Sequence, residues 1–265
     1  MKILLNRIFR KIIREVVKRD SNLASAVEID MKNLQGKGSG AGSTNLEAKL
    51  GLNFLPKHVQ LNPVVLDVGA CTGSYSDAVL ELSPNAKIHA FEPSPKSLET
   101  LNKKFRKSAR VEIYPFALGE KNSERILYAN SPGSVLSSFS KRRLQHINLE
   151  FEHEDLVQVK TLDDWCKSQF INPNLLKIDV EGHELEVLRG GLDTLKRISV
   201  VQFEFGGCNI DSRTFFKDFW HLFKELNFSI YRIASLGAIS IPFYSEEDEY
   251  FHTTNFLAIN QEVNN

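Results

Sequence analysis

Acidic residues recur where short apolar runs give way to glycine or serine, and this recurrence is the strongest chemical signal in the sequence. Five such points lie at 67–73, 92–94, 117–119, 179–182 and 204–207, and four of the five carry a carboxylate. A carboxylate at the end of a buried apolar run is costly unless it is paired or bound to a ligand. The pattern therefore predicts one binding site assembled from several segments of the chain.

The first of these points, Asp67-Val-Gly-Ala-Cys-Thr-Gly73, is typical of a turn between a strand and a helix. Gly69 permits a tight turn, and Gly73 lets the following helix approach closely. Cys71 stands where the dinucleotide pattern G-x-G-x-x-G has the glycine that admits a pyrophosphate. The turn suits a ligand without a pyrophosphate at that place, although a turn that binds no cofactor is the alternative.

Glu92 ends the next apolar run, about 20 residues beyond the glycine turn, a distance at which an acid can accept hydrogen bonds from both hydroxyls of a ribose. The alternative is a solvated glutamate in a loop. Because Glu92 and the glycine turn occur together at this spacing, the sequence favours a ligand that contains a ribose.

The apolar runs are explained by strands that alternate with helices. Strands are predicted over 63–68, 87–91, 111–116, 175–180, 200–205, 228–233 and 255–259, and helices over 74–82, 95–106, 183–188 and 214–226. Alternation of this kind gives parallel strands with right-handed crossovers, and ligands then bind beyond the carboxyl ends of the strands. A loop containing Gly237 joins the last two strands without a helix, which favours an antiparallel hairpin.

We therefore predict an α/β fold with a doubly wound, Rossmann-like, mostly parallel sheet of seven strands, a C-terminal antiparallel hairpin and an N-terminal amphipathic helix. Residues 125–129 and 156–160 are expected to be extra strands around an irregular insertion. Ser137, Ser138 and Phe139 in that insertion either close over the site or belong to a plain solvent loop.

The N-terminal segment differs from the rest of the chain. Residues 3–19 place apolar side chains at three- and four-residue steps, with Arg and Lys between them. Such a basic amphipathic helix packs on its own domain or on a twin subunit, or it lies on an anionic membrane surface. The Gly- and Ser-rich stretch 36–43 is typical of a linker. We therefore predict an N-terminal segment over 1–44 and a ligand-binding domain over 45–265.

The composition argues against several classes of protein. Lys plus Arg and Asp plus Glu both number 33, and a formal charge of zero argues against nucleic-acid binding. Three cysteines without close pairs give neither a disulfide framework nor a zinc site. Charges interrupt any signal-peptide core, and no apolar stretch reaches the ~20 residues of a membrane span. We expect a cytoplasmic protein, with peripheral membrane attachment through the N-terminal helix as an alternative.

From about Val64 to Ile259 the sequence resembles the FkbM-type class I methyltransferases. The segments that carry the resemblance are VVLDVGACTGSYS (64–76), FEPSP (91–95), FALGE (116–120), KTLDDW (160–165), LLKIDVEGHELEVLRGG (175–191) and FEF (203–205). The segment KIDVEGHELEVLRGG is the most specific of them. The N-terminal segment lies outside the resemblance.

The resemblance implies that 45–265 is a methyltransferase domain that binds S-adenosylmethionine and methylates hydroxyl groups, often on sugars or natural products. Asp179 would face the methionine amino group of the cofactor or the reacting centre. The remaining cofactor residues that it implies are Asp67, Gly69, Ala70 and Gly73 at the methionine part, Glu92 on the ribose, Pro93 and Ser94 beside the adenosine, and Ala117 and Leu118 along the adenine.

A hydroxyl acceptor must lose its proton during methyl transfer, and a nearby carboxylate or histidine accelerates that loss. Asp179, Glu181 and His183 follow one predicted strand, and their spacing does not choose among them. His183 is otherwise a residue at a helix N-terminus, and Glu181 a local hydrogen-bond acceptor. No metal is expected, although Asp179 and Glu204 at the ends of neighbouring strands would suit Mg²⁺.

The expected partners are a small-molecule or glycan acceptor and no nucleic acid, with a homo-oligomer as an alternative. Two other functions stay open at this point. One is an NAD-dependent oxidoreductase on a Rossmann-like sheet, against which Cys71 and the antiparallel ending both count. The other is a non-catalytic relative that retains the cofactor pocket.

Overall fold

A computed structural model describes residues 2–38 and 42–263, which form an α/β fold around a large, mostly parallel sheet. Strands β3, β2, β1, β7 and β8 run parallel, whereas β11 is antiparallel to both of its neighbours. Within the described residues the sheet has eight strands, in the order β10 (Gly237–Ser240), β9 (Phe228–Ala234), β11 (Thr254–Asn260), β8 (Val200–Phe205), β7 (Leu175–Ile178), β1 (Val64–Val68), β2 (Lys87–Phe91) and β3 (Val111–Tyr114).

The prediction of seven strands is wrong by one, because β10 lies in the segment interpreted as a loop. Gly237 pairs with Ala234 and so closes a tight hairpin between β9 and β10. Gly237 has a φ of 125°, in a region that glycine adopts readily. As an edge strand with a half-exposed to exposed surface, β10 lacks the apolar alternation that reveals a strand. The predicted antiparallel pairing of the last two strands is confirmed for β9 and β11.

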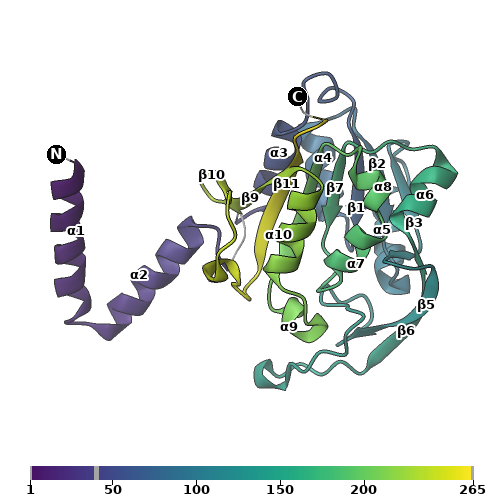
Figure 1. The fold of residues 1–265 in the computed structure, drawn as a ribbon. Helices are drawn as coiled ribbons and strands as arrows, with labels where there is room; N and C mark the ends of the chain where they lie inside the picture. Colours follow the sequence, from purple (N-terminus) through teal and green to yellow (C-terminus); the bar gives the residue numbers. More distant parts are fainter. Residues whose placement is uncertain (1, 39–41, 264–265) are drawn as a thin grey trace.

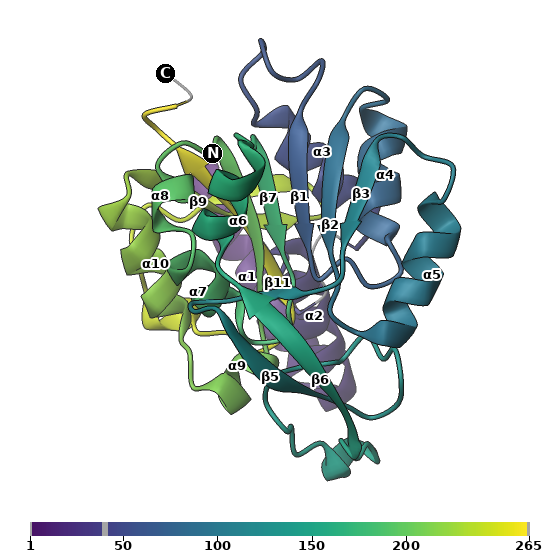
Figure 2. The ribbon, with the colours of Figure 1, turned by 90° about the vertical axis from the view of Figure 1, so that its right-hand side faces the viewer.

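Helices cover both faces of the sheet (Figures 1 and 2). One face is covered by α3 (Thr44–Asn53), α4 (Ser74–Leu82) and α5 (Pro95–Phe105). The other is covered by α6 (Leu162–Gln169), α7 (Glu184–Arg189), α8 (Leu192–Leu195) and α10 (Phe216–Glu225), while the short α9 (Cys208–Ser212) follows β8. Helices α3, α6, α8 and α9 were not predicted from the sequence.

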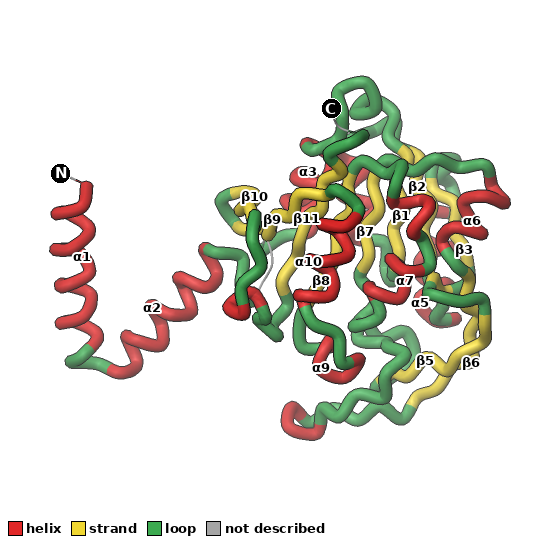
Figure 3. The backbone as a smooth tube through the Cα atoms, in the orientation of Figure 1, coloured by secondary structure: helices red, strands yellow, loops and turns green. Residues whose placement is uncertain are grey.

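The insertion after β3 forms a second, three-stranded sheet. Its order is β4 (Ala117–Leu118), β6 (His153–Lys160) and β5 (Ser123–Ala129), which confirms the two extra strands expected there. The loop that joins β5 to β6 carries the short 3-10 helix η1 (Gln145–Ile147), as Figure 3 shows. A second 3-10 helix, η2 (Glu246–Asp248), lies between β10 and β11.

The N-terminal segment contains two helices where one was predicted. The helix is interrupted between α1 (Lys2–Val17) and α2 (Ser21–Leu34). Asp20 caps the start of α2, because its side chain accepts hydrogen bonds from the backbone N–H groups of Asn22 and Leu23. Both helices extend away from the α/β body in Figure 1. Residues 39–41 of the expected linker lie outside the described residues. None of the described helices is both long and apolar enough to span a membrane.

Candidate functional site

A cavity of about 300 Å³ lies at the carboxyl ends of the central strands. Its wall includes Val68 and Phe91, the last residues of β1 and β2, and residues that follow β7 or end β8. The residues singled out in the sequence that line it are Gly69, Ala70, Cys71, Glu92, Pro93, Ala117, Leu118, Ser137, Phe139, Asp179, Glu181 and Glu204. The convergence expected from the strand ends is therefore present, although Asp67, Gly73, Ser94 and His183 are not part of the wall.

The glycine turn, residues 67–73, is fixed by the backbone that surrounds it. Gly69 has a φ of 77°, and a Cβ at this position would lie 1.9 Å from the carbonyl oxygen of Asp179. Gly73 has a φ of 74°, and a Cβ there would lie 2.4 Å from the ring of Phe105 on α5. The first glycine lets two strand ends approach each other, and the second lets two helices pack.

Asp67 is buried beneath the glycine turn and does not line the cavity. Its carboxylate is fully buried and accepts a hydrogen bond of 2.7 Å from the Ser76 hydroxyl. The Nζ of Lys177 lies 3.4 Å from its other oxygen. Its contacts therefore make Asp67 a group that positions the glycine turn.

Glu92 is held by two backbone donors at the cavity wall. Its Oε2 accepts a hydrogen bond of 2.7 Å from the N–H of Cys71, and its Oε1 accepts one of 2.9 Å from the N–H of Ser94. Burial raises the pKa of Glu92, although these two hydrogen bonds lower it. Each carboxylate oxygen keeps a second lone pair for a ligand. Ser94 itself is buried, and its hydroxyl oxygen has no hydrogen-bond partner among the described residues.

Lys177 is a site residue that the sequence analysis missed. Its buried Nζ lies 3.5 Å from Asp179 Oδ2 and donates a hydrogen bond of 3.3 Å to the carbonyl of Gly69. Burial lowers the pKa of Lys177. The nearby carboxylates of Asp179 and Asp67 raise the same pKa by more, so the ammonium stays charged. A signal existed in the sequence, because residues two apart on a strand share a face and Lys177 precedes Asp179 by two.

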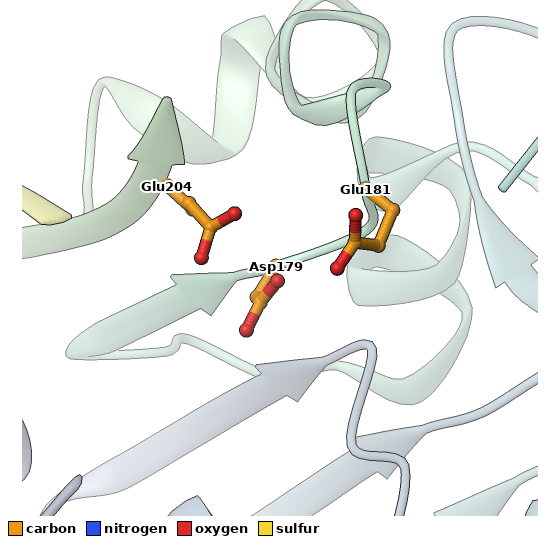
Figure 4. Close-up of side chains that lie close together, drawn as sticks. All are labelled: Asp179, Glu181 and Glu204. Atoms are coloured by element: carbon orange, nitrogen blue, oxygen red, sulfur yellow. The ribbon is translucent and has the colours of Figure 1, made fainter. Parts of the chain in front are cut away.

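Three acidic side chains, Asp179, Glu181 and Glu204, point toward one another at the far end of the cavity and are called the carboxylate cluster here (Figure 4). One oxygen from each lies within 4.8 Å of the others, close enough to hold a divalent cation among them. The two strand ends that carry Asp179 and Glu204 are neighbours, as predicted, because β7 pairs with β8.

Burial and mutual repulsion keep protons on the carboxylate cluster. Burial raises the pKa of Glu181 to about 8, Asp179 raises it as well, and Arg142 lowers it. Burial also raises the pKa of Glu204 well above its ordinary value, again with Asp179 adding to the rise. Like charges this close cannot all ionise at neutral pH. Protons on Glu181 and Glu204 relieve this repulsion, while Asp179 lies next to the Lys177 ammonium.

Glu181 is oriented by groups from the insertion and from α9. Arg142 in the insertion forms an ion pair of 2.9 Å with Glu181 and another of 3.1 Å with Asp211 on α9. The Ser138 hydroxyl donates a hydrogen bond of 2.7 Å to the carbonyl of Glu181. Ser137 and Phe139 line the cavity, so the insertion covers the site.

His183, a candidate base from the sequence, does not face the cavity. It is buried, with Nδ1 2.7 Å from Glu186 Oε1 and Nε2 3.1 Å from the Ser140 hydroxyl. Both ring nitrogens are therefore engaged with the protein. The structure separates His183 from Asp179 and Glu181, because the turn at Gly182 directs it to the N-terminus of α7.

Helix α3, which precedes β1 in the chain, forms part of the cavity wall. The sequence analysis did not predict this helix or its place at the site. Thr44 and Glu47 line the wall. The Oε1 of Glu47 accepts a hydrogen bond of 2.9 Å from the Asn255 side chain. The Oε2 of Glu47 lies 3.5 Å from Nε2 of Gln202, and Oε1 of Gln202 accepts a hydrogen bond from the Tyr75 hydroxyl. These partners come from β11, β8 and α4, so the wall is fixed by the tertiary fold.

The sequence matches the model of the Methyltransferase FkbM domain over residues 67–230, more than half of the chain. It is similar to the 2-O-methyltransferase NoeI of Sinorhizobium fredii, with 27% identity over 54% of this chain and 63% of that protein. It is also similar to the hexuronic acid methyltransferase AglP of Haloferax volcanii, with 27% identity over 57% of this chain and 59% of that protein. The chain thus spans about three fifths of the length of these relatives.

Among solved structures, the fold is similar to that of a methyltransferase FkbM from Methylobacillus flagellatus KT. The two share 15% sequence identity at a TM-score of 0.46, over 74% of this chain and 43% of that one.

Proposed function

Because the chain belongs to the FkbM methyltransferase family, we propose that it transfers a methyl group from S-adenosylmethionine to a hydroxyl group on a sugar, a glycan or a small natural product. The observation that carries this proposal is the one cavity that joins the glycine turn, Glu92 and the carboxylate cluster. Two relatives support the acceptor class, since their names specify 2-O-methylation and a hexuronic acid. Family membership disfavours the alternative of an NAD-dependent oxidoreductase.

The residues at the glycine-turn end fit the cofactor. Glu92 would hold the ribose, because its oxygens retain lone pairs after binding two backbone N–H groups. Ala117 and Leu118 offer apolar surface for the adenine, and Gly69 lets the glycine turn pack closely against the backbone of Asp179 at the cavity wall. When bound, S-adenosylmethionine supplies a methyl group on a positively charged sulfur that is already activated for in-line transfer. Acidic walls suit such a cationic donor.

At the other end we assign removal of the acceptor proton to Glu181. A general base works best when its pKa lies near the working pH, and the pKa of Glu181 is raised to about 8. Arg142 holds the carboxylate in place at 2.9 Å. Asp179, 3.5 Å from the Lys177 Nζ, would orient the acceptor hydroxyl or the amino group of the cofactor. His183 has no part in this scheme because its ring nitrogens are bonded away from the cavity.

The direct test is formation of S-adenosylhomocysteine by the full chain with S-adenosylmethionine and a panel of hexuronic acids, neutral hexoses and hydroxylated natural products. We expect turnover with at least one of them, and NMR of the product would locate a new O-methyl group. Failure to bind either S-adenosylmethionine or S-adenosylhomocysteine in calorimetry would refute the proposal. Tight binding without turnover of any acceptor would instead favour a non-catalytic relative.

A further inference from the structure

Positive charge is concentrated at the N-terminus of a chain whose formal charge is zero. Residues 1–19 contain seven Lys or Arg and one Glu, a net charge of +6, so the other 246 residues carry −6. Such a separation of charge within one chain marks a surface for an anionic partner. The acidic remainder of the chain would be repelled by the same partner, so the basic segment must make the contact.

The charge and the apolar residues of α1 occupy opposite faces. Positions 7, 11 and 14 are basic and follow one another at four- and three-residue steps, and so share a face. Positions 12 and 16 are apolar, lie four residues apart and share another face. The side chains of Ile12 and Val16 are 56% and 44% exposed, and Arg10, Lys11 and Arg14 are exposed too.

The α/β body leaves both faces of α1 accessible. Figure 1 shows α1 at the end of α2, extending away from the sheet and its helices. The end of α2 that meets the body is anchored, since the Nε of Arg232 on β9 donates a hydrogen bond of 2.7 Å to the carbonyl of Gln35. Of the alternatives left open for the N-terminal helix, packing on its own α/β domain is not what α1 does in Figure 1, which leaves a twin subunit and a membrane surface.

We propose that α1 binds an anionic lipid surface, lying in its plane with the apolar face inserted and the basic face among the headgroups. This arrangement removes the apolar face from water and places each Lys or Arg near lipid phosphates. A neutral surface would satisfy the apolar face alone, so the charge on α1 specifies an anionic one. The inference is independent of the proposed methyl transfer.

The test is flotation of the full chain with phosphatidylcholine vesicles, with and without phosphatidylglycerol. We expect flotation only with the anionic vesicles, and release at high salt because the charge contribution is screened. The double variant Arg10→Gln/Arg14→Gln should bind about tenfold or more weakly, and Ile12→Asp/Val16→Asp should abolish flotation. Matched controls are Arg106→Gln/Lys107→Gln, exposed at the end of α5, and Leu61→Asp, at a side chain that is 73% exposed.

Three outcomes would overturn the proposal. The first is equal flotation with neutral and anionic vesicles, and the second is equal loss of binding in the control variants. The third is a dimer in light scattering that Ile12→Asp/Val16→Asp dissociates while vesicles bind neither protein, which would make α1 an interface between copies. Turnover and cofactor binding are measured separately, so failure of flotation leaves the proposed methyl transfer untouched.

Discussion

The two ends of the cavity treat their acidic groups in opposite ways. At the glycine-turn end, Glu92 accepts two backbone hydrogen bonds and Asp67 is paired with Ser76 and Lys177. At the other end, three carboxylates crowd within 4.8 Å, and the pKa values of Glu181 and Glu204 are raised. The first arrangement stabilises a fixed shape, whereas the second holds unfavourable electrostatics of the kind that clusters at functional sites.

The largest effect, a loss of stability, is expected from Gly69→Ala at the glycine-turn end of the cavity. The new Cβ would lie 1.9 Å from a carbonyl oxygen at a φ of 77°, so the strand ends must separate. We expect a loss of about 4 kcal/mol in the free energy of unfolding, measured by urea denaturation. The matched control is Gly237→Ala, also at positive φ but with nothing within 4 Å of the new Cβ, which should cost about 1 kcal/mol. Equal losses in the two variants would show that the turn is no tighter than an ordinary hairpin.

The second prediction concerns the end of the cavity that carries the carboxylate cluster. Glu181→Gln should lower kcat by about 10²- to 10⁴-fold while cofactor affinity stays unchanged, because a base is lost and no cofactor contact is. In the native enzyme kcat should rise with pH and level off above about 8, since Glu181 must lose its proton to act. Glu186→Gln, which removes a carboxylate that binds His183 outside the cavity, should keep nearly full activity. A flat pH profile would remove Glu181 as the base.

The third prediction concerns the glycine-turn end of the cavity. Glu92→Ala should weaken binding of S-adenosylmethionine by about 1.5–3 kcal/mol, the value of a charge-assisted hydrogen bond. Isothermal calorimetry measures the change, with the exposed Glu99→Ala on α5 as the control. A dissociation constant that does not move would take Glu92 out of the cofactor site. Together with Glu181→Gln, this variant separates cofactor binding from catalysis.

The same contrast governs what the sequence reveals. Gly69, Glu92 and Asp179 lie directly after apolar runs, so local pattern alone predicts the cavity that they line. Lys177 lies inside such a run, and its role depends on the register that sets it opposite Asp67 on β1. Two-residue periodicity places Lys177 on the face of Asp179, but its pairing with Asp67 depends on strand register, a tertiary property that local periodicity does not contain.

Glu47 and Thr44 show a second limit. They come from α3, outside the resemblance, and Glu47 reaches partners on β8 and β11 that lie 155 and 208 residues away in the sequence. His183 shows the reverse case, a chemically suitable residue next to the site that the backbone turns away. Residue type identified the chemistry, but only the fold decided which side chains face the cavity.

A smaller effect tests whether the carboxylate cluster destabilises the fold. The pKa of Glu204 is raised in the folded state by burial, Asp179, Glu181 and Glu184, against Lys177. Ionisation therefore favours the unfolded state, and the stability that the protonated group provides is lost as pH rises. Glu204→Gln should raise Tm by about 2–4 °C at pH 8, a change of roughly 1 kcal/mol, and by nothing at pH 4. A lower Tm at pH 8 in scanning calorimetry would mean that the native carboxylate has a stabilising partner.

The smallest effect is expected from removing divalent cations, although the carboxylate cluster has the geometry to bind one. The Nζ of Lys177 already lies 3.5 Å from Asp179 Oδ2, so a fixed cation neutralises the carboxylate that a metal would need most. A divalent ion would also have to displace protons from Glu181 and Glu204. Turnover should therefore be the same before and after dialysis against EDTA. If activity instead falls and Mg²⁺ restores it, the crowded carboxylates serve as metal ligands, and Glu204→Gln should then lose activity in the same proportion.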